Sequence, residues 1–457
     1  MANLRLRRIR VRNFKSLGDV RVELRQLNVV IGPNASGKTN FIELFLLLKE
    51  LYARYVRNPV IPPYRYWWRW ENVVWRGSDE PMRVEMDFES PDYEARLDVV
   101  VDYVDRLAIP YERLEVRCPS RNYYVTLEKR HGTATLTINR DYLEGLAPSE
   151  VKGLLKLAAP HAREALERVL REGSLTVRTA AESLLAPRAI FAGMVARGEG
   201  VAAINYGRDF SDRDYVLVAP GPLRRVAVRV GERQVLRFEH LLVMALRELE
   251  RFFRRIVVLK PMDAQSAREP KPLRLEAELD VHLRNLANVL YTVFHRRGGR
   301  VPDRVESLIK LAYGREVHLW PKPTEDGRVM VCATEGGAEL PPPCLSDSLL
   351  KLLGIGLALE QEPSVLAIDQ VEDSLHAKTI EVVIDELRSL GSTTVILTTH
   401  SPAVIDLLSP EDVVLCEMTE EGTKLRRLRE PEALRRRLGE LGLTLSEAYI
   451  YGGLDGG

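Results

Sequence analysis

Residues 32–39 read Gly-Pro-Asn-Ala-Ser-Gly-Lys-Thr, which matches the pattern G-x-x-x-x-G-K-[ST]. In this pattern the glycines let the backbone curl until its N–H groups surround phosphate oxygens. The lysine reaches the outer phosphates, and the final hydroxyl ligates Mg²⁺. A buried apolar strand is expected at residues 27–31, and an apolar-periodic helix at about residues 39–52. This context predicts a phosphate-binding loop rather than a chance glycine turn.

Two further apolar runs lead into residues whose side chains can bind a metal ion or take part in catalysis. Residues 364–368 form a buried strand that leads into Asp369, and residues 394–398 form another that leads toward His400. A carboxylate at the tip of a parallel strand lies beside a P-loop and can hold Mg²⁺, although an ordinary strand-end cap is the alternative. An imidazole on the neighbouring strand can hydrogen-bond a γ-phosphate or the attacking water, whereas a lone histidine is usually structural.

A possible anion site precedes the most apolar helix of the chain. Residues 345–348 read Leu-Ser-Asp-Ser and lead into a run rich in leucine. Ser346 and Asp347 suit a helix start, where free N–H groups attract an anion; the alternative is a simple cap.

The order of the expected elements predicts how the chain is divided. A βα unit near the start and an αβαβ order near the end indicate one parallel sheet that is assembled from both ends. Residues 82–138 alternate as in an antiparallel sheet, and helical spacing dominates residues 149–197 and 238–253. We therefore expect a discontinuous head, residues 1–140 and 255–457. An insertion at residues 141–254, mainly helical and of unknown role, separates its two parts.

Composition restricts the class of protein but not the function. The 457 residues carry a net charge of +1, with 45% hydrophobic and 29% charged side chains, which excludes disordered, collagen-like and membrane proteins. The four cysteines are scattered without a C-x-x-C pair, so no zinc site or disulfide framework is expected and a cytoplasmic setting is the default. No signal peptide or membrane-spanning run is predicted.

Together, the P-loop, the serine-containing helix start, the strand-end aspartate and the strand-end histidine resemble a known family. They resemble the ABC-type ATPase heads of the RecF, SMC and OLD relatives, especially the compact RecF/OLD-like "AAA family ATPases" without a long coiled coil. The resemblance implies an α/β P-loop NTPase head with a mixed or parallel core sheet and a flanking antiparallel β-sheet. It also implies that Mg²⁺ and ATP bind between one P-loop and the signature helix of a partner head, in an ATP-dependent homodimer.

The resemblance carries over to individual residues. Those expected to bind the nucleotide, Mg²⁺ or the attacking water are Lys15, Gly32, Asn34, Ser36, Gly37, Lys38, Thr39, Asn40, Ser346, Asp347, Ser348, Asp369, Gln370, Glu372 and His400. Thr39 and Asp369 are the expected Mg²⁺ ligands, and Gln370, Glu372 and His400 are the expected catalytic positions.

The chain departs from the family pattern in three places. Ser348 replaces a signature glycine, and no glutamine between Gln26 and Gln234 supplies the Q-loop. Gln370 replaces the glutamate that deprotonates water, and an amide cannot accept that proton, so hydrolysis is expected to fall while ATP binding survives. Either the protein is natively a slow switch or the chain carries a Glu→Gln change that traps ATP; the intact surrounding motif favours the second. Glu372 is a nearby carboxylate that can partly substitute.

An aromatic and basic stretch at residues 64–76 holds four of the five tryptophans. Such residues can stack bases and bind phosphates, with Trp67 and Arg69 as the residues to test. The alternative is a packed lid with arginines that extend to solvent.

Two functions remain open from the sequence. The first is an ATP-dependent switch that acts in DNA repair or maintenance, or in defence against foreign nucleic acid. The second is a non-hydrolysing nucleotide sensor that regulates a separate effector protein. A self-contained nuclease fits poorly, because the 57 residues after His400 lack a clear carboxylate cluster for two metals.

Overall fold

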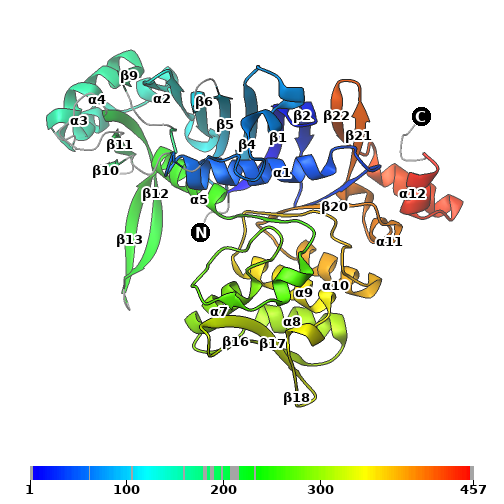
Figure 1. Ribbon diagram of the computed structural model, residues 1–457. Helices are drawn as coiled ribbons and strands as arrows, with labels where there is room; N and C mark the ends of the chain where they lie inside the picture. The colour runs from blue at the N-terminus through cyan, green and yellow to red at the C-terminus, as the bar shows by residue number, and fades with distance from the viewer. Residues whose placement is uncertain are drawn as a thin grey trace. The chain divides into compact units, whose positions relative to one another are not determined.

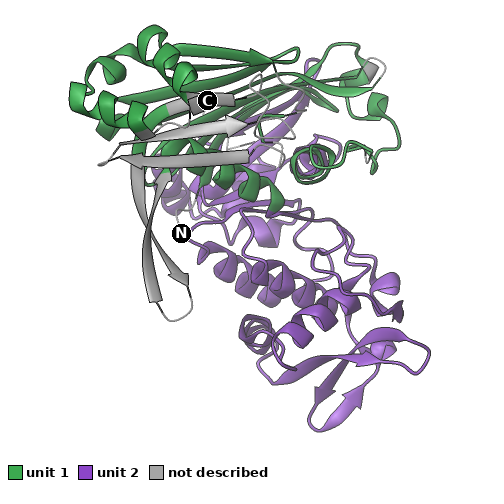
Figure 2. Cartoon of the chain, turned by 90° about the vertical axis from the view of Figure 1, so that its left-hand side faces the viewer, with its two compact units in different colours: residues 1–21, 47–254 green, residues 22–46, 255–457 purple. Residues whose placement is uncertain are grey.

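The computed structural model describes residues 4–60, 62–103, 106–157, 160–178, 183–185, 190–196, 199–205, 216–230 and 233–452. The chain forms two compact units, one of residues 1–21 and 47–254 and the other of residues 22–46 and 255–457 (Figure 2). Each unit draws on separate stretches of sequence.

The second unit is built on a mixed sheet in the order β14-β19-β20-β3-β21-β22. Parallel pairing aligns Leu259 with Ile368, Ile368 with Leu397, and Thr399 with Ile31, so these strands end at one edge. The strands are β3 (Leu27–Ile31), β14 (Ile256–Leu259), β19 (Val365–Ile368), β20 (Thr394–Thr399), β21 (Val413–Thr419) and the antiparallel β22 (Gly422–Arg427). The predicted assembly of one core sheet from both ends of the chain is confirmed.

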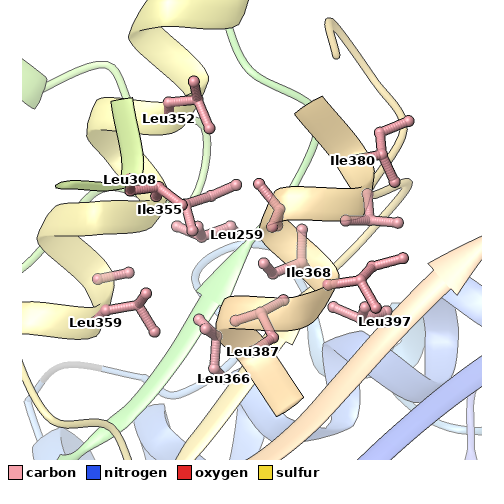
Figure 3. Packing of buried hydrophobic residues seen from close by; sticks show 14 of the residues in the cluster. Leu259, Leu308, Leu352, Ile355, Leu359, Leu366, Ile368, Ile380, Leu387 and Leu397 are labelled. Carbon is pink, nitrogen blue, oxygen red and sulfur yellow. The ribbon is translucent and has the colours of Figure 1, made fainter. Parts of the chain in front are cut away.

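Helices pack beside this sheet and form the largest apolar core. Figure 3 shows Leu352, Ile355 and Leu359 of α9 beside Leu308 of α8, with Leu366 and Ile368 of β19 and Leu387 of α10 nearby. Gly356 permits the close approach of α8, because a Cβ there would lie 2.9 Å from Val305 Cγ2 and 3.2 Å from its Cα. The helices are α1 (Lys38–Lys49, which begins in this unit), α6 (Ala264–Arg268), α7 (Leu286–Arg296), α8 (Asp303–Tyr313), α9 (Asp347–Glu360), α10 (Ala377–Arg388), α11 (Pro402–Ile405), α12 (Pro431–Leu441) and α13 (Leu445–Ile450).

A small antiparallel sheet in the order β15-β17-β16, with β18 paired to β17, completes this unit (Figure 1). Its strands are β15 (Lys271–Pro272), β16 (Val317–Pro323), β17 (Arg328–Glu335) and β18 (Ala338–Leu340).

The first unit contains the predicted antiparallel sheet, in the order β2-β1-β4-β5-β6-β7-β8-β9. Alternate residues of β4 are buried, as its period-two pattern predicts. The strands are β1 (Arg5–Phe14), β2 (Leu17–Glu23), β4 (Met82–Glu89), β5 (Glu94–Tyr103), β6 (Leu107–Cys118), β7 (Tyr123–Arg130), β8 (Thr133–Ile138) and β9 (Ser174–Arg178).

The segment 141–254 is less helical than expected. It contains helical residues of α2 (Arg140–Glu144), α3 (Pro148–Leu157), α4 (Pro160–Glu172) and α5 (Leu241–Arg254). It also contains β9 and a sheet of β10 (Ile190–Ala196), β11 (Glu199–Asn205), β12 (Val216–Val230) and β13 (Arg233–His240). The valines of β12 alternate with arginine and alanine near its end, which is a strand pattern that the leucine spacing of the flanking helices obscured. Among the described residues, no helix combines the length and apolarity that a bilayer crossing requires.

Candidate nucleotide-binding site

The P-loop connects the buried strand β3 to helix α1. Gly32 is required sterically, because a Cβ at this position would lie 2.1 Å from the backbone oxygen of Cys416 in β21. Ala35 and Gly37 have φ values of 62° and 106°, so the loop curls through the left-handed region before the helix begins. The carbonyl oxygen of Ser36 accepts hydrogen bonds from Thr423 Oγ1 at 2.8 Å and Cys416 Sγ at 3.3 Å. The loop is therefore anchored to the β21–β22 hairpin.

Lys38 turns its ammonium group back onto this loop. Lys38 Nζ donates hydrogen bonds to the backbone oxygens of Gly32 and Pro33, both at 2.8 Å. Partial burial lowers the pKa of Lys38. Phosphate oxygens at the N-terminus of α1 can replace these two carbonyl acceptors with stronger charge-assisted partners.

Thr39 of the P-loop and Asp369 at the end of β19 are in direct contact. Thr39 Oγ1 donates to Asp369 Oδ2 at 2.9 Å, and Thr398 Oγ1 of β20 donates to Asp369 Oδ1 at 2.6 Å. The carboxylate is 3% exposed, and its backbone N–H donates to the oxygen of Leu259. A hydroxyl and a carboxylate are hard oxygen ligands that fit Mg²⁺, an ion that keeps several waters and binds phosphates. The sequence prediction did not include Thr398, although it is a polar residue in an otherwise apolar buried run.

Gln370, Glu372 and His400 lie at the same carboxyl edge of the core sheet. The backbone of Gln370 has a φ of 51° and its N–H donates to Thr398 Oγ1 at 2.8 Å, while its side chain is exposed. Glu372 Oε1 accepts the backbone N–H of His400 at 3.0 Å and lies 3.0 Å from His400 Nδ1. The His400 side chain is 56% exposed, whereas that of Glu372 is 14% exposed. The carboxylate is therefore held against the histidine, and the histidine faces solvent.

The predicted signature residues form the start of α9. Ser346 is its N-cap, and Ser346 Oγ accepts the N–H of Leu349 at 3.2 Å and lies 2.9 Å from the hydroxyl of Tyr313. Asp347 pairs with Arg268, whose guanidinium also donates to the oxygen of Leu345. Ser346 and Asp347 are exposed, and Ser348 is half-buried. Tyr313 and Arg268 are contacts that the sequence did not predict.

The remaining predicted residues are placed differently. Asn34 is exposed on the P-loop and Asn40 lies in the first turn of α1. Lys15 belongs to the other unit, where its ammonium lies 5.5 Å from the ring centre of Trp67.

At the carboxyl edge of the core sheet, Lys260 follows β14 and pairs with Glu43 of α1 at 2.5 Å. This second link between α1 and the sheet edge was also missed.

Two stretches of the chain match known domain families. Residues 5–96, which include the P-loop, match a family described as "AAA ATPase domain". Residues 239–406, which include Asp369 and His400, match one described as "AAA domain, putative AbiEii toxin, Type IV TA system". Both ATPase matches coincide with the parts of the chain that form the P-loop and the strand-end residues.

Over these two stretches the chain is similar to AAA-type ATPase domains. The solved structures that the chain matches include SMC head domains. One is an SMC head bound to the C-terminal winged-helix domain of ScpA (12% identity, 94% of this chain and 99% of that chain covered, TM-score 0.41). Another is the SMC head from Thermotoga maritima (13% identity, 93% and 99% covered, TM-score 0.37). A third is an SMC head with an extended coiled coil, bound to the ScpA C-terminal domain, from Pyrococcus furiosus (12%, 96% and 100%, TM-score 0.40). No curated protein matches this sequence.

Proposed function

We propose that this ATPase-domain protein binds Mg·ATP through its P-loop and the Asp369 edge of the core sheet. The observation that carries the proposal is the 2.9 Å hydrogen bond between Thr39 and Asp369, residues 330 positions apart. It places the last residue of the phosphate-binding pattern against the carboxylate at the strand end. When bound, Mg²⁺ would neutralise phosphate charge, with Thr39 and Asp369 supplying oxygen ligands.

Slow hydrolysis follows from the residues beside Asp369. The amide of Gln370 can orient a water but cannot accept its proton. Glu372 has one oxygen engaged by His400, and its Oε2 has no hydrogen-bond partner among the described residues. Glu372 is therefore a carboxylate that can accept a proton with low efficiency, and His400 orients it. A deliberate Glu→Gln change at residue 370 and a natively slow switch both fit this arrangement.

The biological action that we propose is head-to-tail dimerisation on Mg·ATP. Ser346 and Asp347 are exposed at the N-terminus of the long helix α9, where a helix dipole and free N–H groups favour an anion. A phosphate that is held by the P-loop of one protomer can also be contacted by the N-terminus of α9 in a second copy of the chain. Size-exclusion chromatography with light scattering tests this: Mg·ATP should convert a monomer into a dimer. A monomer under both conditions would contradict the sandwich arrangement.

DNA is the partner that the aromatic stretch favours, in a cytoplasmic role in repair, maintenance or defence. The structure makes Trp68, instead of Trp67, the residue to test for nucleic-acid binding. Trp67 and Trp70 are buried, at 8% and 7% exposed, whereas Trp68 is 87% exposed with a φ of 69°. An exposed indole next to exposed Arg69 can stack a base of single-stranded nucleic acid while the guanidinium binds phosphate.

The second candidate is a nucleotide sensor that does not hydrolyse ATP and instead controls a separate effector protein. Gln370 is the observation that favours it, because the expected base is missing. Phosphate release by the Gln370→Glu variant separates the two candidates. A restored turnover supports a hydrolysing switch, and no gain supports the sensor.

A further inference from the structure

Lys351 is a buried lysine in α9 whose ammonium group lacks a direct partner in the part of the chain that the structure describes. Its side chain is 0% exposed, and Lys351 Nζ has no hydrogen-bond acceptor among the described residues. Burial lowers the pKa of Lys351. Taking an ammonium out of water without a partner costs several kcal/mol, so a compensating interaction is expected nearby.

That compensation comes from the short loop after β19. The carboxylates of Asp373, Asp369 and Glu372 all act electrostatically on Lys351 and oppose the effect of burial on its pKa. None of the described carboxylates forms an ion pair with Lys351 within 4.0 Å. The ammonium therefore acts on the loop through its field and occupies none of the carboxylate oxygens by direct pairing.

The acidic loop of residues 369–373 is stabilised by a positive charge nearby. Three carboxylates lie within residues 369–373, and two of them are largely buried: Asp369 is 3% exposed and the Glu372 side chain 14%. Glu372 Oε2 is buried and, like Lys351 Nζ, has no hydrogen-bond partner among the described residues. Carboxylates so close together in a low-dielectric site repel each other unless a cation is near. The backbone of the loop is also constrained, with φ of 51° at Gln370 and 62° at Ser374.

We propose that Lys351 is a built-in counter-charge that stabilises the acidic loop of residues 369–373 before Mg²⁺ binds and that competes electrostatically with Mg²⁺ for it. This inference rests on the proposed Mg·ATP site. Lys351 is a positioning residue, since it reaches the metal and the nucleotide only through the loop. Because Lys351 lies in the helix that Ser346 caps, the same helix carries the proposed contact to a second copy and the counter-charge for the metal ligand. The Mg²⁺ concentration needed for nucleotide binding is thereby set in part by a residue that does not itself bind Mg²⁺.

The test is the Lys351→Met variant, which keeps the volume of the side chain and removes the charge. Binding of a non-hydrolysable ATP analogue is measured by calorimetry over a range of Mg²⁺ concentrations. The half-saturating Mg²⁺ concentration is expected to fall about tenfold, because a nearby positive charge is gone. The matched control is Lys310→Met, which removes an exposed lysine from α8 and should leave the Mg²⁺ midpoint unchanged.

A thermal measurement provides a readout that is independent of nucleotide chemistry. In the Lys351→Met variant, the rise in Tm caused by Mg²⁺ and the analogue should exceed that of the wild type, since the metal replaces the lost charge. A variant that folds only with Mg²⁺ and the analogue would give the same support. An unchanged or higher Mg²⁺ midpoint, or a variant that is unfolded under both conditions, would overturn the inference. If the wild type itself shows no Mg²⁺-dependent nucleotide binding, the proposed function fails instead.

Discussion

Thr39 and Asp369 are joined by a hydrogen bond of 2.9 Å, although 330 positions of sequence separate them. The bond connects the phosphate-binding loop to the carboxyl end of β19, and Thr398 holds the other oxygen of the same carboxylate.

Lys38→Ala should weaken ATP binding by about thirtyfold, because a hydrogen bond to a charged group contributes about 2 kcal/mol. Among the described residues, Lys38 Nζ donates only to two backbone carbonyls of its own loop, so the variant should remain folded. Calorimetric titration of ATP measures the affinity, and circular dichroism checks the fold. Full affinity in the folded variant would place the nucleotide elsewhere.

Gln370→Glu should increase phosphate release by about 10²-fold, since a positioned general base contributes at least that much. ATP affinity should change little, because the exposed side chain of residue 370 is proposed to orient water and not to hold the phosphates. A steady-state phosphate assay measures the change. The double variant Gln370→Glu with Lys38→Ala is the control, and it should return to the background rate.

Ser346→Asp should abolish the Mg·ATP-dependent dimer while the protomer still binds ATP. Aspartate is a good N-cap, so α9 should be preserved, but its charge repels the phosphate of a second copy. Light scattering reports the dimer and calorimetry the affinity. A dimer that persists in this variant would exclude Ser346 from the interface.

Trp68→Ala should weaken single-stranded DNA binding by about tenfold, because stacking of one base contributes about 1–3 kcal/mol. The matched control is Val60→Ala, another exposed apolar side chain of the same unit, at 85% exposed. Fluorescence anisotropy with a labelled oligonucleotide at fixed salt measures both. Equal affinities of the two variants would remove Trp68 from any nucleic-acid contact.

Gly32→Ala should destabilise the protein by at least about 2 kcal/mol, because the added methyl group meets a backbone oxygen that cannot move away easily. Gly439→Ala, in α12 with nothing within 4 Å, is the control and should be neutral or slightly stabilising. Urea unfolding compares the two. Similar midpoints for both variants would show that the P-loop relaxes around the methyl group.

The sequence predicted those parts of the fold that local pattern determines. The strands β3, β19 and β20 and the antiparallel sheet of the first unit follow from runs of apolar residues and from alternation, and both are present. The strand β12 was missed because helical spacing on either side dominated the interpretation. The sequence pattern also placed Asp369 and the P-loop on strand ends that a parallel sheet brings together.

Other features of the site depend on tertiary packing that no local pattern records. The contact of Thr398 with Asp369 arises from the parallel register of β19 and β20. The burial of Lys351 arises because α9 is buried on all sides between Leu349 and Leu359, so a lysine in this run has no exposed face. The exposure of Trp68, rather than Trp67, follows from a turn conformation with positive φ.

The most direct test of the central claim is a calorimetric titration of ATP into the wild-type protein and into Asp369→Asn, each with and without Mg²⁺. Mg²⁺ should increase the affinity of the wild type by at least about tenfold, and this gain should disappear in Asp369→Asn, which retains the shape of the side chain and loses its charge. An equal Mg²⁺ gain in both proteins would contradict the claim that Asp369 and the P-loop form one Mg·ATP site.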